Sequence, residues 1–95
     1  MAIRDVNATV FLRSQEYDVY AVPELERELA GLRPGNCIID FANVDYVDST
    51  GIAVLVGCLK RLVLQDPASS ITFVNLHKNV RKVFEILELG RLFRI

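Results

Sequence analysis

A short segment of acidic and hydroxyl side chains precedes the most apolar stretch of this sequence. It contains Asp45, Asp48, Ser49 and Thr50, and the residues from Gly51 onward are almost purely apolar. Hydroxyl side chains at such a position are most often helix N-caps, because their oxygen can accept a hydrogen bond from a free backbone N–H group. A second hypothesis is phosphorylation, with Ser49 as the first candidate and Thr50 as the second.

A phosphate group on Ser49 would meet two opposing influences. The free N–H groups and the dipole of a helix N-terminus favour an anion. The phosphate would nevertheless stand among Asp45 and Asp48 and would add about −1.5 to −2 charges to an acidic surface. We therefore expect modification of Ser49 to disturb the fold little and to alter a docking surface strongly.

The two aspartates also raise the hypothesis of an enzyme. The segment DYVDST (45–50) is similar to the Asp-x-Asp-x-Thr motif of haloacid-dehalogenase-type phosphatases, but its second aspartate comes one position late. The chain is also too short to supply the lysine and the distal acids of such a Mg²⁺ site. His77 has no catalytic partner nearby in the sequence, and there is no glycine-rich phosphate loop. We predict no enzyme activity, no metal site and no cofactor.

Size and composition restrict the classes of protein that fit. The 95 residues suit a single domain spanning 1–95, and 52% of them are apolar, which is enough for a packed core. A net charge of −1 argues against general binding of nucleic acid. No apolar run reaches the length of a membrane span and no signal peptide is recognisable, so we expect a cytoplasmic protein without membrane insertion. Cys37 and Cys58 are expected to be free thiols.

Apolar runs and turn residues predict the strands. Two short strands are expected at 3–6 and 8–13, around a tight turn at 5–7. The run 37–41 is short and mainly apolar, which is typical of a strand buried on both faces, and 71–76 is predicted to be another buried strand.

The second of the two N-terminal strands also shows alternation of its side chains. Val10 and Leu12 should share one face of their strand, while Phe11 points the other way. The segment 14–22 is expected to be a loop. The final residues, RLFRI, are expected to form an edge strand or a docking turn.

Three segments carry helical periodicity. The first starts near Pro23, has Leu25, Leu29 and Leu32 at helical spacing, and is ended by the glycines and proline at 31–35. The second is predicted over 51–64. The third is predicted over 79–89, with Gly90 in the C-cap position. Its apolar stripe consists of Val80, Val83, Phe84 and Leu87.

The second helix has two different faces. One face is apolar and should contact the sheet; it consists of Ile52, Leu55, Val56, Leu59 and Val63. The opposite face is smaller and more polar, and consists of Ala53, Gly57, Lys60 and Leu64, flanked by Val54 and Arg61. A glycine in the middle of a helix costs about 1 kcal/mol relative to alanine. Either a partner packs closely on this face, or loops of the same chain cover it.

The alternation of strands and helices predicts an α/β fold. We expect one domain with a mixed, mostly parallel sheet of four to five strands and three to four helices. In such sheets functional groups gather at the carboxyl ends of parallel strands. Asp40 belongs to the same strand-to-helix connection as the acidic segment, and Glu16 and Asp18 are expected to approach the same edge.

Several motifs together resemble one known family. The segment IIDFANVDYVDSTGIAVLVG (38–57) resembles the central signature of STAS domains, which occur in anti-sigma factor antagonists and in the cytosolic tails of sulfate transporters. The segment EYDVYAVPEL (16–25) resembles their Glu-Leu-Asp…Pro-Glu-Leu segment, and residues 79–95 resemble their final helix and tail. Gln15 and Ala53 stand where the family usually has glycine.

The resemblance implies a function and the residues that perform it. Ser49 matches the serine that an anti-sigma factor kinase phosphorylates, and Thr50 matches the neighbouring hydroxyl. The protein would then bind an anti-sigma factor serine kinase, release a sigma factor, and be switched off by phosphorylation; a phosphatase is a further candidate partner. The implied partner-binding residues are Glu16, Asp18, Asp45, Asp48, Ser49, Thr50, Gly51, Ala53, Val54 and Gly57.

A second setting keeps the fold and changes the partner. Stand-alone STAS domains also resemble accessory subunits of ABC lipid-transport systems and scaffold components of stress-signalling complexes. In that setting the helix from Gly51 would dock on an ATPase or on a sister domain, and Ser49 would serve only as a cap. The oligomeric state, a monomer or a weak dimer, stays open.

Overall fold

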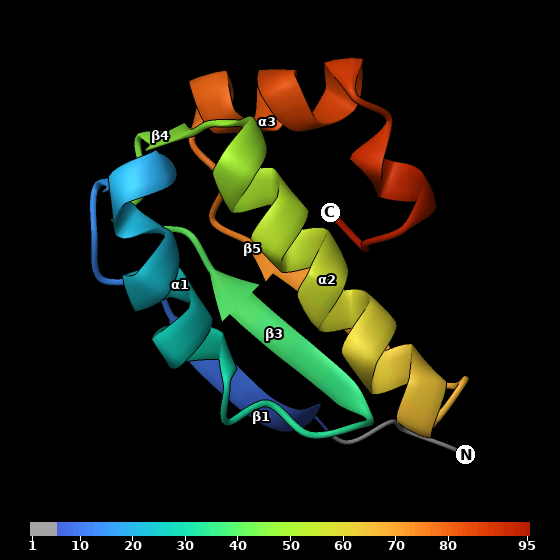
Figure 1. Ribbon diagram of the computed structural model, residues 1–95. Helices are drawn as coiled ribbons and strands as arrows, with labels where there is room; N and C mark the ends of the chain where they lie inside the picture. Colours follow the sequence, from blue (N-terminus) through green and yellow to red (C-terminus); the bar gives the residue numbers. More distant parts are fainter. Residues whose placement is uncertain (1–5) are drawn as a thin grey trace.

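The computed structural model describes residues 6–95, so the strand expected at 3–6 lies almost wholly outside them. Five strands, three α-helices and two single-turn 3₁₀ helices follow one another along the chain (Figure 1). In order they are β1 (Val6–Phe11), β2 (Glu16–Tyr17), η1 (Val19–Ala21), α1 (Val22–Leu29), β3 (Asn36–Asp40), β4 (Tyr46–Val47), α2 (Ser49–Gln65), β5 (Ser70–Val74), α3 (Lys78–Ile86) and η2 (Leu89–Arg91).

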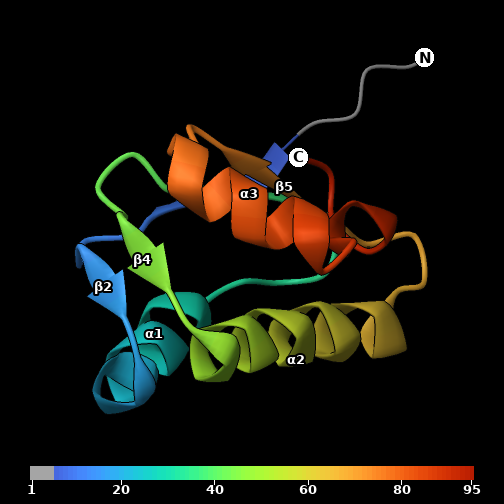
Figure 2. The same cartoon turned by 90° about the horizontal axis from the view of Figure 1, so that it is seen from above.

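The main sheet has three parallel strands in the order β1-β3-β5. Helices α1 and α2 lie side by side on one of its faces, and α3 lies on the β5 side (Figures 1 and 2). The α/β fold is as predicted, but the strands form two sheets, one of three strands and one of two, where one sheet of four to five was expected. Every strand pair among residues 6–95 is parallel, so no antiparallel member of a mixed sheet is present there.

The second sheet consists of β2 and β4, both of which lie in segments expected to be loops. Glu16 pairs with Tyr46, and Tyr17 pairs with Val47. Strands of two residues are too short to show a period in the sequence, and this is why they were not predicted.

The core takes one face of each main strand, so β3 and β5 are fully buried on one face and only half-buried on the other, where burial on both faces was expected. The buried residues include Leu12, which directly follows β1, Ile39 in β3 and Ile71 in β5. Phe11 is exposed, as expected. Four aromatic rings, Phe41, Phe73, Phe84 and Phe93, then join β3, β5, α3 and the C-terminal segment, with centroids 4.4–5.7 Å apart in the contacting pairs. Edge-to-face and offset pairs of this kind add to the free energy gained from burial alone.

Helix α1 follows its sequence pattern closely. Leu25, Leu29 and Leu32 are all buried. The guanidinium of Arg61, on α2, donates to the backbone oxygens of Leu32 at 3.0 Å and Leu29 at 3.1 Å. These two carbonyl groups lie at the C-terminal end of α1, where helices leave acceptors without intrahelical partners, so Arg61 joins the two helices.

The two ends of the described chain differ from the prediction. Val6 and Asn7 belong to β1 rather than to a tight turn, and the turn signal appears instead as a register shift between Val6 and Ala8. At the other end the left-handed residue is Glu88, with φ of 56°, and not Gly90. Helix α3 therefore ends earlier than expected.

The early end of α3 changes what its apolar stripe covers. Val80 and Phe84 are buried as predicted, but Val83 and Leu87 are substantially exposed. The final residues do form a docking turn, because Arg94 makes an isolated parallel bridge with Thr72 beside β5. No helix in the described part of the chain is long and apolar enough to cross a membrane.

Helix α2 begins two residues earlier than predicted, and its buried stripe is slightly rotated. Val56 and Val63 are only half-buried, and Cys58 and Leu62 take their places among the buried residues, which are Gly51, Ile52, Leu55, Cys58, Leu59 and Leu62. Cys37 and Cys58 are free thiols, as expected, and burial raises the pKa of each. The outer face, with Ala53, Gly57, Lys60 and Leu64, is exposed, so no loop among residues 6–95 covers it and the second of the two alternatives is wrong.

Gly51 is the residue of α2 that lies closest to the small sheet. A Cβ atom at this position would stand 2.9 Å from the backbone oxygen of Tyr17 and 2.9 Å from Cγ1 of Val47. Both distances are shorter than a Cβ atom normally makes to a neighbouring atom. The Tyr17 oxygen belongs to the backbone and cannot rotate away. The first turn of α2 can therefore reach β2 and β4 only without a side chain here.

Two glycine substitutions in this helix should have opposite effects. Gly51→Ala should lower the free energy of unfolding by about 1–3 kcal/mol, because the added methyl group overpacks the contact with Tyr17. Gly57→Ala is the matched control: nothing lies within 4 Å of its added Cβ, so it should raise stability by up to about 1 kcal/mol through helix propensity. Urea denaturation measures both. Stabilisation by both substitutions would contradict the close approach at Gly51.

Candidate functional site

The β2–β4 pair places two distant acidic segments side by side. Because Tyr17 pairs with Val47, Asp18 follows β2 at the point where Asp48 follows β4. The backbone N–H of Asp48 donates to the oxygen of Tyr17 at 3.2 Å. The expectation that Glu16 and Asp18 approach the same edge as the residues before α2 is therefore confirmed.

Asp48 is the N-cap of α2, a place that the sequence interpretation gave to a hydroxyl. Its Oδ1 accepts hydrogen bonds from the backbone N–H groups of Thr50 at 2.9 Å and Gly51 at 3.1 Å, and from the hydroxyl of Thr50. The hydroxyl hypothesis was wrong because the helix starts at Ser49, which moves the cap position back to the aspartate.

The same contacts change the acidity of the cap. The hydrogen bond from the Thr50 side chain is the largest influence that lowers the pKa of Asp48 below its ordinary value of 3.8. Desolvation is the second-largest influence and opposes this shift, and the backbone N–H groups of Gly51, Thr50 and Val19 each lower the pKa by a smaller amount. Each of these donors stabilises the ionised carboxylate, so Asp48 stays negative while it holds the helix.

Ser49 and Thr50 differ sharply although they are neighbours. The Thr50 side chain is partly buried, and its hydroxyl is engaged by Asp48. Ser49 is exposed, and its hydroxyl has no hydrogen-bond partner among residues 6–95. Of the two hydroxyls, only that of Ser49 is thus both accessible and free to react.

Asp18 forms a second cap next to the first. Its Oδ1 accepts from the backbone N–H groups of Tyr20 at 3.0 Å and Ala21 at 3.2 Å, and this closes the single turn η1. The turn η1 packs against α2, and the N–H of Val19 is one of the groups that lower the pKa of Asp48. Figures 1 and 2 show the two elements adjacent from both directions.

Tyr17, the buried residue of β2, supports the two caps from the core side. Its ring is buried, and its hydroxyl accepts from the backbone N–H groups of Arg13 and Ser14, at 3.1 Å each. The hydroxyl donates in turn to Oε1 of Glu28 on α1 at 2.6 Å. Burial, followed by the hydrogen bond to Glu28, raises the pKa of Tyr17 to about 12, so the phenol remains protonated and keeps donating.

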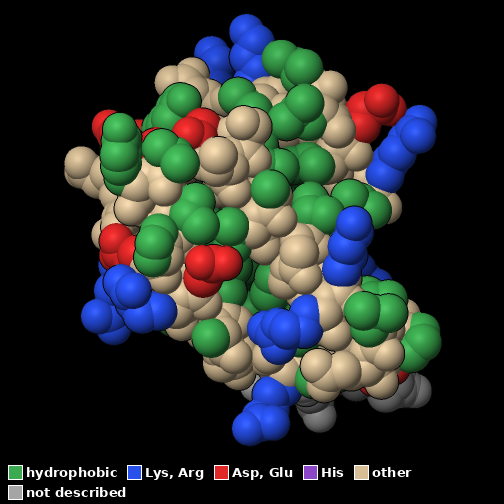
Figure 3. All heavy atoms as spheres, in the orientation of Figure 1, with side chains coloured by type: hydrophobic (Ala, Val, Ile, Leu, Met, Phe, Trp, Pro, Cys, Tyr) green, Lys and Arg blue, Asp and Glu red, His purple; other side chains and the backbone are tan. Residues whose placement is uncertain are grey.

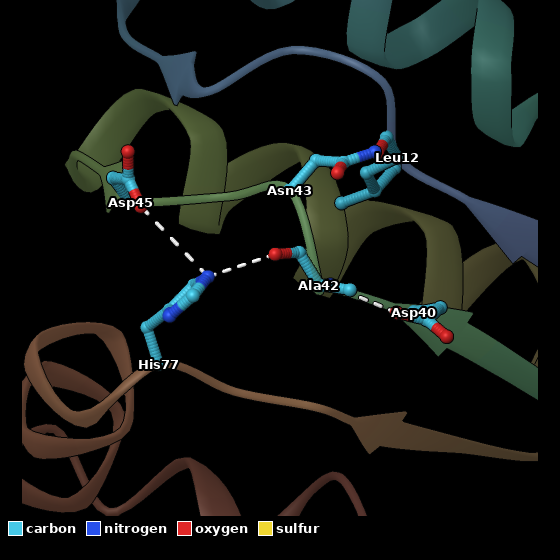
Figure 4. Close-up of polar contacts among 6 residues, drawn as sticks. All are labelled: Leu12, Asp40, Ala42, Asn43, Asp45 and His77. Carbon is cyan, nitrogen blue, oxygen red and sulfur yellow. Dashed lines mark hydrogen bonds and ion pairs between the residues drawn. The ribbon is translucent and has the colours of Figure 1, made fainter.

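The loop between β3 and β4 is fastened at several points (Figure 4). Asp40 accepts from the N–H of Ala42 at 2.8 Å, and the Asn43 amide donates to the oxygen of Leu12 at 3.4 Å. His77, at the start of α3, contacts the oxygen of Ala42 at 2.8 Å, and its Nε2 lies 3.8 Å from Oδ1 of Asp45. His77 thus holds the β3–β4 loop in place.

The remaining predicted residues lie further along α2. Ala53, Val54 and Gly57 face a groove of about 450 Å³ between α1 and α2. Its other lining residues are Glu26, Leu29, Ala30, Cys58 and Arg61. The outer face of α2 is therefore bordered by α1, and the space beside Gly57 is open.

Two exposed apolar residues of the site were not predicted. Val19 is 54% exposed and Tyr20 is 90% exposed, and both belong to η1 beside the α2 N-terminus. Apolar side chains gather beside acidic ones over this part of the surface (Figure 3). The sequence did contain a signal, since an aromatic residue two positions after a capping aspartate stands outside the apolar pattern of α1.

Comparison with known proteins gives consistent results. Residues 4–95 match the family model described as STAS domain. An anti-sigma-B factor antagonist of Staphylococcus epidermidis is 35% identical over 83 residues, which cover 84% of this chain and 75% of that protein. The Staphylococcus aureus protein of the same name has the same identity and coverage.

Solved structures agree with the fold. A Thermotoga maritima protein, described as a candidate anti-sigma factor antagonist, superposes with a TM-score of 0.72 at 16% identity, covering 98% of this chain and 83% of that one. The anti-sigma factor antagonist SpoIIAA, in its unphosphorylated form, gives a TM-score of 0.59 at 22% identity, covering 90% of this chain and 78% of that one.

The hydrogen bond between Thr50 and Asp48 can be tested by titration. Thr50→Val should raise the pKa of Asp48, because it removes the largest influence that lowers it. A pKa that is lower in the folded chain stabilises the fold above its ordinary value of 3.8, and this contribution disappears as pH falls through the folded value. Thr50→Val should therefore lose less stability on acidification than the parent chain.

Carboxyl ¹³C NMR measures the pKa, and urea denaturation at several pH values measures the stability. Ser49→Ala is the matched control, since its hydroxyl does not contact Asp48, and it should leave the pKa of Asp48 unchanged. A pKa that moves in Ser49→Ala but not in Thr50→Val would contradict the assignment of the cap.

Proposed function

This chain belongs to the STAS domain family, and on that premise we propose that it acts as an anti-sigma factor antagonist controlled by phosphorylation at Ser49. In its unphosphorylated form it would bind an anti-sigma factor serine kinase and thereby release a sigma factor. Its relatives in Staphylococcus are named as anti-sigma-B factor antagonists. The structure of SpoIIAA, a protein of the same fold, is described as that of its unphosphorylated form. This role would place the protein in the cytoplasm of a bacterial cell.

The availability of Ser49 is the observation that carries the proposal. A kinase needs a hydroxyl that it can reach and that is not tied up in the fold. Ser49 is exposed and unbonded within the described chain, whereas Thr50 is committed to the Asp48 cap. The second-choice residue would have to give up a structural hydrogen bond before it could be modified.

The cap also determines what a phosphate at Ser49 would do. The N–H groups of Thr50 and Gly51 already donate to Asp48, so a phosphate finds them occupied. It would remain on the outer surface, close to a carboxylate of the same sign. We infer that modification changes the charge and hydration of the docking surface and leaves the helix in place.

The geometry of the two aspartates gives no support to the enzyme hypothesis. Asp48 accepts hydrogen bonds from three donors of its own helix. Asp45, in the β3–β4 loop, lies 3.8 Å from Nε2 of His77. To act as a nucleophile, either carboxylate would first have to give up these contacts. We therefore propose a binding role and assign no catalytic residue.

Two variants at Ser49 should separate the states of the switch. Ser49→Ala should bind the anti-sigma factor of its own organism constitutively. Ser49→Asp should bind at least about tenfold more weakly, which corresponds to about 1.4 kcal/mol of lost interaction. Affinity purification of each tagged variant, with mass spectrometry of the recovered proteins and of Ser49 occupancy, provides the measurement.

Thr50→Val is the control in the same experiment, because it removes the neighbouring hydroxyl and leaves Ser49 available. It should still be phosphorylated by the recovered kinase. Equal recovery of the kinase by Ser49→Ala and Ser49→Asp would refute the switch. Recovery of the ATPase of an ABC system in its place would support the transport setting.

A further inference from the structure

The most exposed large apolar side chain beside the switch residue belongs to η1. Tyr20 is 90% exposed, and its neighbour Val19 is 54% exposed. Single apolar residues on a surface need no explanation. These two, however, are consecutive, and they project from a turn that lies against the first residues of α2. We call them the Val19–Tyr20 patch.

The backbone beneath the patch is fixed. The N–H groups of Tyr20 and Ala21 both donate to Oδ1 of Asp18, and the N–H of Ala21 also lies 3.0 Å from the Asp18 carbonyl oxygen. An aromatic side chain on such a turn can be buried by a partner with little loss of backbone entropy. Tyrosine is also among the residues that most often dominate binding energy at the centre of protein interfaces.

The surroundings of the patch define the chemistry of a partner. Segments 15–21 and 44–54 contain four carboxylates, Glu16, Asp18, Asp45 and Asp48, and no lysine or arginine. Two of these acids, Asp18 and Asp48, are occupied as caps, whereas the side chain of Asp45 is 64% exposed. A complementary surface therefore has an apolar pocket with basic side chains at its margin.

We propose that Tyr20, supported by Val19, is the apolar anchor of the docking surface, and that it inserts into an apolar pocket with a basic margin on the anti-sigma factor. This inference rests on the function proposed above and adds the residue that supplies most of the affinity. Ser49 is the first residue of α2, the helix that η1 contacts.

The anchor also explains how a phosphate can oppose binding although the partner's margin is basic. A phosphate on Ser49 carries about −1.5 to −2 charges and is strongly hydrated. Beside the Val19–Tyr20 patch it would have to lose water within an apolar contact, and this cost opposes docking. The acids at the margin remain hydrated or paired, and they contribute mainly to the rate of association.

The test compares two tyrosine variants with a matched control on α2. The probe is the anti-sigma factor recovered with Ser49→Ala, and isothermal titration calorimetry measures its affinity. Tyr20→Ala should weaken binding about thirtyfold or more, the loss typical of an interface anchor. Tyr20→Phe keeps the ring and should stay within about threefold of the parent.

Leu64→Ala is the control, because Leu64 is 86% exposed on the same helix that begins at Ser49 but lies about 22 Å along it. It should bind like the parent chain. Both side chains project into solvent, so the thermal unfolding midpoints of the three variants should not change. An equal effect of Tyr20→Ala and Leu64→Ala, or no effect of Tyr20→Ala, would overturn the anchor.

The result can be separated from the fate of the proposed switch. If Ser49→Asp loses binding and Tyr20→Ala does not, the switch stands and the anchor is wrong. If Tyr20→Ala loses binding and Ser49→Asp does not, the docking surface stands and phosphorylation does not control it. If no anti-sigma factor is recovered with Ser49→Ala, both proposals fail together.

Discussion

The contact between the backbone carbonyl of Tyr17 and the first turn of α2 determines the rest of the site. The carbonyl accepts from Asp48, and Gly51 lies so close to it that no side chain fits between them. Through this contact the two-residue strands β2 and β4 become neighbours of a long helix. The buried phenol of the same tyrosine fixes the preceding loop to α1. One residue thus joins the small sheet to two of the three helices.

A division of labour between the polar side chains follows. Asp18 and Asp48 satisfy the N–H groups at the starts of η1 and α2, and Thr50 reinforces the second cap. Ser49, Val19 and Tyr20 are left facing solvent on this rigid support. Groups that hold the fold and groups available to a partner are therefore adjacent but distinct. A regulatory charge can act on the second group without disturbing the first.

Much of the fold could be predicted from the sequence, because burial imposes a period on long elements. The runs that became β3 and β5 are short and rich in apolar residues, and the leucines of α1 recur at helical spacing, so their approximate positions could be predicted. The pair β2 and β4 could not be found in this way. Each has two residues, and their pairing depends on the absent side chain of Gly51, which is a tertiary effect.

The candidate site was predicted in its location but not in its details. The approach of Glu16 and Asp18 to the residues before α2 followed from where the strands end. The identity of the cap did not, because aspartate, serine and threonine all cap helices well and the choice depends on where the helix starts. Similarly, Glu88 rather than Gly90 adopts the left-handed conformation at the end of α3, because packing of the C-terminal segment overrides local preference.

We propose that phosphorylation of Ser49 acts on a docking surface and leaves the fold unchanged. Comparison of ¹⁵N–¹H amide spectra of the unmodified and the Ser49-phosphorylated chain tests it most directly. If the phosphate acts on the surface alone, the amide shifts will be confined to η1, β4 and the first turns of α2, and the amides of β3, β5 and α3 will not move. Shifts that extend through the core strands or into α3 would contradict it, since they would show that the phosphate rearranges the fold.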